Sequence, residues 1–363
     1  MKIVADENMP FVAELFSPYA DVSLLSGREI TAQDLIGTDV LLVRSVTAVD
    51  ARLLDGSSVR FVGTATIGTD HVDKPYLQRR GIEFASAPGC NANAVVQYVL
   101  SAFSALQQNW HQLKVGIIGC GNVGGLLYHQ LKRLGVNCCC FDPFISPAQI
   151  TDLVPLEEVL RCDAVCLHTP LTVDGDHPTF HLLNEQMLSR LKPGAILLNA
   201  GRGAVIDNRA LLKLLPYHAL RVVLDVWESE PEISLALLNA VDLATPHIAG
   251  HSVNGKVKGT LMLRDAFCRW SGQSIQKFDS PEIVRKVKAS SLGEAILGSY
   301  DIRADDKRMR QALLAVGVEV GAAFDQLRKN YPERWEFQNF SISPEGKAEL
   351  WNKLAVLGFA QTG

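Results

Sequence analysis

The sequence predicts an α/β protein with two doubly wound domains and a small C-terminal module. Short apolar stretches alternate with helical patterns from residue 1 to about 250, as expected for parallel strands covered by helices. A long amphipathic pattern follows at 255–272, and from about 285 the chain becomes charge-rich and helical. At 363 residues the chain is also too long for one ordinary hydrophobic core.

The composition excludes several classes of protein. With 47% hydrophobic and 20% charged residues, the chain is typical of ordered globular proteins. The net charge of −4 gives no general attraction to nucleic acid or to an anionic membrane. The N-terminus "MKIVADENMP" lacks the apolar core of a signal peptide, and no apolar run is long enough to span a bilayer. We therefore expect a cytoplasmic protein that binds neither nucleic acid nor membrane.

Neither a disulfide framework nor a metal site is expected. None of the eight cysteines forms a C-x-x-C pair, and three of them are consecutive in an apolar run at 138–140. Small buried thiols commonly fill a central strand. The expectation is therefore reduced core cysteines, in a protein without a bound metal ion.

The N-terminal part predicts a small α/β domain. Its strands are expected at 1–6, 39–45, 59–66 and 81–88, and its helices at 11–19 and 74–81. The amphipathic helix at 255–272 can return to it. The predicted domain therefore comprises residues 1–94 and 250–282, and we expect it to bind the substrate.

The middle of the chain predicts a larger domain of the same type. Strands are expected at 113–119, 136–142, 163–169, 195–200 and 219–226, separated by helices at 121–135, 156–161, 184–191 and 207–215. Continuously apolar strands of this kind belong to a parallel sheet buried on both faces. Residues 95–249 are thus expected to form a Rossmann-like domain. The remaining residues, 283–363, predict a third module small enough to be an assembly element.

A dinucleotide site is predicted where the first strand of the larger domain ends. Gly119, Gly121 and Gly124 follow the pattern G-x-G-x-x-G and open a helix, and Asp142 ends the next strand. The glycines permit a tight turn and close approach of a pyrophosphate, while the acidic side chain meets a ribose hydroxyl. No basic residue immediately follows Asp142 to receive a 2′-phosphate. The sequence therefore favours NAD over NADP.

Three side chains of the larger domain predict hydride-transfer chemistry. Arg202, Glu230 and His247 each follow an apolar run, where ligands gather at the carboxyl edge of a parallel sheet. An imidazole can take the hydroxyl proton, a carboxylate can orient that imidazole, and a guanidinium can grip a substrate carboxylate. The spacing of His247 and His251 does not predict a zinc helix, because Pro246 and Gly250 interrupt the segment.

The motifs "GIIGCGNVGG", "HTPLT", "LKPGAILLNAGRGAVID", "LDVWESEP" and "TPHIAG" resemble the D-2-hydroxyacid dehydrogenase family over most of residues 1–275. The resemblance implies that Arg202, Glu230 and His247 are catalytic, with His247 as the acid/base. It also implies contacts to NAD from a larger set of residues. They are Gly119, Gly121, Asn122, Val123, Gly124, Asp142, Thr169, Ala200, Gly201, Asp225 and Gly250.

Five further segments narrow the resemblance to one branch of that family: "MKIVADENMP", "LLVRSVT", "TATIGTDHVD", "APGCNANAVVQYV" and "FDQLRKNYPERWEF". The branch oxidises 4-phospho-D-erythronate in vitamin B6 biosynthesis and uses its C-terminal α+β domain to form a homodimer. The likeness implies that Arg44, Ser45 and Thr66 bind this phosphorylated 2-hydroxy acid. His251 departs from the pattern, since the branch has Tyr there. The histidine could bind substrate on a shorter reach or cap the following helix.

Two other functions remain open at this point. The chain could be a different D-2-hydroxyacid dehydrogenase, one that acts on 3-phosphoglycerate, glyoxylate or hydroxypyruvate. It could also be a non-catalytic protein that senses NAD. The intact Arg202, Glu230 and His247 set argues against the non-catalytic alternative.

Overall fold

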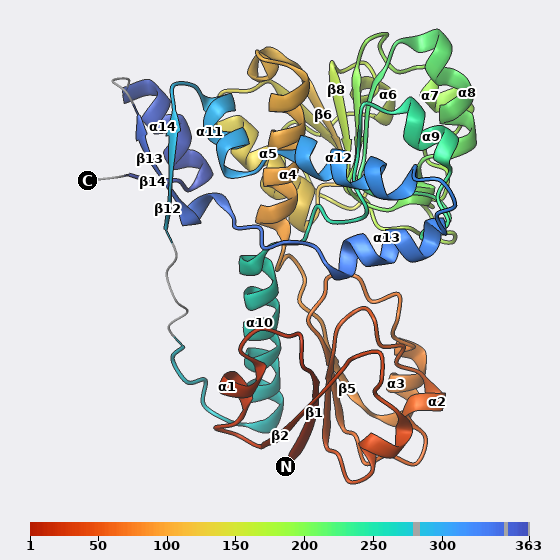
Figure 1. Cartoon of the computed structure of the whole chain (residues 1–363), viewed down its shortest axis with the longest axis vertical. Helices are drawn as coiled ribbons and strands as arrows, with labels where there is room; N and C mark the ends of the chain where they lie inside the picture. Colours follow the sequence, from red (N-terminus) through yellow and green to blue (C-terminus); the bar gives the residue numbers. More distant parts are fainter. Residues whose placement is uncertain (279–283, 345–347, 362–363) are drawn as a thin grey trace. The chain divides into compact units, whose positions relative to one another are not determined.

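The computed structural model describes residues 1–278, 284–344 and 348–361, and the chain forms two compact units (Figure 1). The first unit comprises Met1–Asn91 and Ser252–Glu282, and the second comprises Ala92–His251 and Ile283–Gly363. The predicted boundary at 282–283 lies outside the described residues. Within the part of the chain that the structure describes, no helix is long and apolar enough to cross a membrane.

The first unit is built on a five-stranded sheet in which every pair is parallel, in the order β2-β1-β3-β4-β5. Its strands are β1 (Lys2–Asp6), β2 (Asp21–Leu25), β3 (Val40–Val43), β4 (Phe61–Thr64) and β5 (Glu83–Ala85). The helices are α1 (Val12–Phe16), α2 (Ala51–Leu54), α3 (Lys74–Arg80), α10 (Val253–Ser271) and the 3₁₀ turn η1 (Ala32–Leu35). Long α10 packs Leu263 and Phe267 into this unit's core, so the predicted return of this helix is confirmed. Strand β2 was missed because it is a partly exposed edge strand without a continuous apolar run.

The second unit has a six-stranded parallel sheet in the order β11-β10-β9-β8-β6-β7. Its strands are β6 (Val115–Ile118), β7 (Cys138–Phe141), β8 (Ala164–Leu167), β9 (Ile196–Asn199), β10 (Arg221–Leu224) and β11 (Leu243–Ala244). Two elements precede β6: α4 (Ala92–Leu106) and the 3₁₀ turn η2 (Trp110–Gln112). Between the strands lie α5 (Asn122–Arg133), α6 (Leu156–Val159), α7 (Glu185–Leu188), the 3₁₀ turn η3 (Gly203–Val205), α8 (Asn208–His218) and α9 (Leu235–Ala240). The chain leaves β6 toward β7 and then returns to β8 on the other side of β6. Ligands bind at such a switch point in open α/β sheets.

The C-terminal region adds a three-stranded parallel sheet, β12 (Arg285–Ala289), β13 (Phe340–Pro344) and β14 (Ala360–Gln361). Its helices are α11 (Leu292–Ser299), α12 (Ile302–Leu313), α13 (Val320–Lys329) and α14 (Ala348–Leu357), with the 3₁₀ turn η4 (Phe337–Asn339). This region shares its core with residues 92–251: Ile296 joins the apolar cluster of α4, and Phe324 joins that of β8 and β9. It therefore lies in one compact unit with the larger sheet.

The predicted fold class is confirmed. There are two doubly wound parallel sheets and a small C-terminal α+β region. The continuously apolar runs are the strands whose residues are buried on both faces, as in β6 and β8. The consecutive cysteines at 138–140 lie in β7, and all eight cysteines are buried and free of disulfides.

Candidate active site

The predicted site residues of the second unit follow its parallel strands at one edge of the sheet. Gly119 comes directly after β6, Asp142 after β7, and Asp225 after β10. Arg202 lies three residues past the end of β9, and His247 lies three residues past β11. Because neighbouring parallel strands end at the same edge, these residues lie along that edge.

The glycine-rich turn has the geometry of a phosphate cradle. A methyl group on Gly119 would lie 2.9 Å from the Thr169 amide nitrogen, and one on Gly124 would lie 1.9 Å from the Gly119 carbonyl oxygen. At Gly121, by contrast, no atom of the described residues lies within 4 Å of such a methyl group. Asn122 and Val123 begin α5 beside this open space, so the unpaired N–H groups of the helix face it. These residues fit a dinucleotide pyrophosphate.

The acidic side chain predicted to meet the ribose lies beside this turn. One carboxylate oxygen of Asp142 accepts a hydrogen bond from the Cys120 amide at 2.8 Å, and the other accepts from the Phe144 amide at 2.9 Å. The carboxylate is half-buried and anchored next to Gly119 and Gly121. Its place relative to the glycines is the one that the dinucleotide pattern requires.

Thr169 lies between the glycine turn and the loop that carries Arg202. It touches Gly119 on one side, and a methyl group on Gly201 would lie 2.9 Å from its carbonyl oxygen on the other. Its Oγ1 and both ring nitrogens of His168 are buried, without a hydrogen-bond partner among the described residues. Burial lowers the pKa of His168 to about 4, so its imidazole is neutral at physiological pH.

The loop carrying Arg202 is shaped by Asn199, which the sequence reasoning missed. The buried Asn199 side chain accepts a hydrogen bond from the Gly201 amide at 3.0 Å and donates one to the Arg202 carbonyl at 2.9 Å. Arg202 itself is half-buried, and its Nη1 donates to the Gly201 carbonyl at 2.9 Å. The available signal was a polar amide at the end of a buried strand, directly before Ala200.

The structure brings His247 and Glu230 together. Nδ1 of His247 lies 2.8 Å from Oε2 of Glu230, whose Oε1 accepts a hydrogen bond from the Trp227 amide at 2.7 Å. The side chains are 34% and 19% exposed, respectively. Because Nδ1 faces the carboxylate, Nε2 is the nitrogen that can face a substrate. This arrangement can support acid–base chemistry by a tautomer-fixed imidazole.

The loop that carries His247 is held by Asp225. The Asp225 carboxylate is 1% exposed and accepts hydrogen bonds from the amides of Ile248 at 2.7 Å and Ala249 at 2.9 Å. Burial raises the pKa of Asp225, while its hydrogen bonds act in the opposite direction. His247 has a left-handed backbone with φ +56°, a conformation that needs such support in a residue other than glycine. Asp225, predicted to contact NAD, thus also supports the loop that ends at Gly250.

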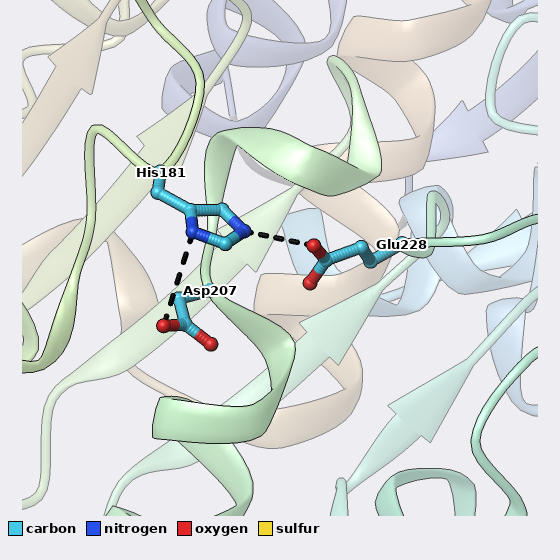
Figure 2. A group of neighbouring side chains, drawn as sticks. All are labelled: His181, Asp207 and Glu228. Carbon is cyan, nitrogen blue, oxygen red and sulfur yellow. Dashed lines mark hydrogen bonds and ion pairs between the residues drawn. The ribbon is translucent and has the colours of Figure 1, made fainter.

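Figure 2 shows His181 with Glu228 and Asp207, the one group of the described residues whose side chains lie close enough to suggest a metal site. Nε2 of His181 lies 2.8 Å from Glu228 Oε1, and Nδ1 lies 3.9 Å from Asp207 Oδ2. The two carboxylates approach different nitrogens of the imidazole ring, Glu228 at Nε2 and Asp207 at Nδ1. Glu228 also accepts a hydrogen bond from the Asn208 amide at 3.1 Å. The cluster anchors the loop between Asp225 and Glu230.

In the first unit, two predicted substrate residues follow β3 and one follows β4. These strands pair, with Val43 opposite Thr64, so Arg44, Ser45 and Thr66 lie at the same edge of the sheet. Arg44 Nε donates to the buried Asp6 at 2.9 Å, and Ser45 is exposed.

The Thr66 hydroxyl is part of a polar cluster that the sequence reasoning missed. It lies 2.8 Å from the Thr64 hydroxyl and donates to the Gly68 carbonyl at 2.8 Å. His71 Nε2 in turn lies 2.9 Å from the Thr64 hydroxyl, and burial lowers the pKa of His71. The signal was a histidine within "TATIGTDHVD".

His251 does not cap the helix that follows it. The N-cap of α10 is Ser252, whose hydroxyl accepts a hydrogen bond from the Gly255 amide at 2.9 Å, so the capping alternative is wrong. The ring of His251 lies edge-on to Tyr331 of the C-terminal region, with 5.7 Å between ring centroids.

Two family models match the chain. The first, "D-isomer specific 2-hydroxyacid dehydrogenase, NAD binding domain", matches residues 95–249. The second, a domain of unknown function, matches residues 275–358. The predicted NAD cofactor is thereby confirmed, since the residues at the glycine turn fit it and the matched model is an NAD-binding domain.

Curated relatives and solved structures extend the comparison. The erythronate-4-phosphate dehydrogenase of Cellvibrio japonicus is 52% identical to this chain, and that of Saccharophagus degradans is 48% identical; each alignment covers 99% of both chains. The NAD⁺-bound 3-phosphoglycerate dehydrogenase of Entamoeba histolytica has the same fold, with a TM-score of 0.65 and 21% identity over 75% of this chain and 95% of that one. The chain therefore belongs to the erythronate-4-phosphate dehydrogenases, within the D-2-hydroxyacid dehydrogenase family.

Proposed function

We propose that this protein oxidises 4-phospho-D-erythronate with NAD to (R)-3-hydroxy-2-oxo-4-phosphooxybutanoate, in vitamin B6 biosynthesis. The substrate follows from the names of full-length relatives at about half identity. The observation that carries the chemistry is the 2.8 Å contact between His247 and Glu230 at the edge where the glycine turn lies. An oriented imidazole at such an edge is the group that alcohol oxidation requires.

His247 acts as the general base. Its Nε2 takes the proton of the C2 hydroxyl while the hydride leaves C2, and the imidazolium that forms is stabilised by Glu230 through Nδ1. Glu230 stays fixed because the Trp227 amide binds its second oxygen. When bound at the glycine turn, NAD supplies the hydride acceptor.

The anionic ends of the substrate are bound by a separate set of residues. Arg202 grips the C1 carboxylate and polarises the C2 oxygen, a bidentate role suited to a guanidinium. We assign the phosphate to Arg44, Ser45 and Thr66, and we propose that His251 also binds the substrate. The exposed Ser45 hydroxyl and a guanidinium already oriented by Asp6 suit an anion.

The enzyme is further proposed to act in the cytoplasm as a homodimer formed through its C-terminal region. The 39.7 kDa chain should then sediment at twice its own mass. A species with the mass of one chain at micromolar concentration would contradict the dimer.

A substrate panel tests the proposed activity. NADH formation is followed with 4-phospho-D-erythronate, its unphosphorylated form, 3-phosphoglycerate, and glyoxylate in the reverse direction. The first compound should be preferred, and Ser45→Ala should raise its KM more than that of the unphosphorylated form. Ser58→Ala is the matched control, since Ser58 is an exposed serine before β4, at the other edge of the sheet. Preference for 3-phosphoglycerate, or no turnover with any compound, would overturn the proposal.

A further inference from the structure

Arg334 is a buried cation in the segment that follows α13. Its residue exposure is 5%, and it lies in the region that the family model of a domain of unknown function matches. A guanidinium so removed from water must find polar partners, because burying an unpaired charge is costly. Two of those partners are in the loop that carries His247.

The guanidinium binds the backbone directly after His247. Nη2 donates to the carbonyl of Ala249, and Nη1 lies 3.4 Å from the carbonyl of Ile248. Nη2 also donates to the Ala94 carbonyl at 3.1 Å, so the loop is tied to the first turn of α4. The amides of the same two loop residues are bound by Asp225. Asp225 therefore holds the N–H groups of this loop, while Arg334 holds its carbonyl groups.

The C-terminal region also supplies the surroundings that make the buried charge tolerable. The guanidinium lies over the ring of Tyr300, 4.4 Å from its centroid. The hydroxyls of Tyr300 and Tyr331 both donate to one carboxylate oxygen of buried Asp305, at 2.8 and 2.7 Å. A cation over an aromatic face near a buried carboxylate is stabilised by both.

We propose that Arg334 is a positioning residue of the active site, through which the C-terminal region holds His247 in the geometry that proton transfer requires. The proposal rests on the role assigned above to His247. In this proposal the C-terminal region contributes to catalysis within its own chain, in addition to the dimer contact proposed above. His247 has a left-handed backbone, and loss of the carbonyl contacts after it should let the loop relax.

The test compares two arginines of the C-terminal region that bind backbone carbonyls. Arg310 of α12 donates to the carbonyl of Leu238 in α9 at 2.6 Å and to that of Val241, directly after α9, at 2.9 Å. Neither carbonyl is in the His247 loop. Arg334→Met and Arg310→Met each remove contacts of a guanidinium to backbone carbonyls, at different places. Arg310→Met also removes an ion pair with Asp306 at 2.8 Å. Arg334→Lys keeps the charge but cannot reproduce the planar fork.

Arg334→Met should lower kcat by about 10- to 100-fold, as expected when a catalytic group is displaced by roughly 1 Å. The Kd for NAD should be unchanged, Arg334→Lys should lie in between, and Arg310→Met should keep the kcat of the unchanged enzyme. A kcat for Arg334→Met equal to that of Arg310→Met, with both variants folded by circular dichroism, would overturn the proposal.

Hydrogen–deuterium exchange gives a readout that does not depend on the substrate. The amides of Ile248 and Ala249 should exchange faster in Arg334→Met than in the unchanged enzyme or in Arg310→Met. Faster exchange in a chain that fails to oxidise 4-phospho-D-erythronate would refute the proposed substrate and keep the positioning role. Unchanged exchange in an active chain would refute only the positioning role. If Arg334→Met does not fold, the same comparison is made with Arg334→Lys.

Discussion

Replacing Glu230 by Gln should do more harm than removing its side chain. The Trp227 amide donates to Oε1, so in Glu230→Gln the amide oxygen takes that position and the NH₂ group faces His247 Nδ1. A neutral imidazole that accepts at Nδ1 carries its proton on Nε2. In that tautomer Nε2 cannot take a proton from the substrate hydroxyl. The variant should hold the base in its inactive form.

The expected loss of activity in Glu230→Gln is the sum of two free energies. Charges about 4 Å apart in an effective dielectric of about 20 interact by about 4 kcal/mol. Because the His247 side chain is 34% exposed, we take about half of that value for the lost stabilisation of the imidazolium. Breaking the amide hydrogen bond to restore the active tautomer adds about 2 kcal/mol. The total of about 4 kcal/mol corresponds to a loss of roughly 10³-fold in kcat.

Steady-state NADH formation, with NAD affinity measured separately, checks this ranking. Glu230→Ala presents no amide proton to Nδ1, so its loss should be only about 30-fold, the equivalent of 2 kcal/mol. Glu232→Gln changes the same charge two residues away on an exposed position and should keep full activity. If Glu230→Gln were as active as Glu230→Ala, the tautomer argument would be refuted.

Other expectations concern the cofactor turn, the loop support and acid stability. Gly121→Ala should weaken NAD binding by about tenfold, or roughly 1.4 kcal/mol, without lowering the melting temperature, because the described structure has no atom within 4 Å of the added methyl group. Gly124→Ala should instead lower the melting temperature, since its methyl group would lie 1.9 Å from the Gly119 carbonyl oxygen; calorimetry and thermal melts distinguish the two. His181→Gln should lower kcat by about three- to tenfold, as expected when one hydrogen bond of the loop support is weakened by about 1 kcal/mol, and an unchanged kcat would show that the Glu228 contact does not support the loop. Burial lowers the pKa of His168 to about 4 in the folded chain. In the unfolded chain this histidine takes up its proton at a higher pH, near 6.5, so acid favours the unfolded state. The free energy of unfolding should therefore fall as pH drops from about 6.5 toward 4, by about 2 kcal/mol at about pH 5. Denaturant titrations at neutral pH and at about pH 5 should show a larger loss in the unchanged protein than in His168→Gln, in which only His71, whose pKa is also lowered by burial, still contributes in this way.

The parts of the site that were predictable are those with local signals. The turn from Gly119 to Gly124 was predictable because at both of these residues the backbone lies so close to neighbouring backbone atoms that only glycine fits there. Strands such as β6 and β8 were predictable because a strand that is buried on both faces of the sheet needs a continuous run of apolar residues. The exposed edge strand β2 has no such demand and was missed. Asn199 and Trp227 act through hydrogen bonds to or from the backbone, and the residue pattern does not specify the partners of these bonds.

By itself the sequence determined the type of sheet and the glycine turn, because each depends on residues that are neighbours in the chain. It also predicted Arg202, Glu230 and His247 as a catalytic set. Only the tertiary structure decided how the imidazole is held: Asp225 lies 22 residues before it, and Arg334 comes from beyond α13. A buried charge is stabilised by whichever groups packing brings to it. Those groups come from distant segments, so their pairing is a property of the folded chain and not of any stretch of it.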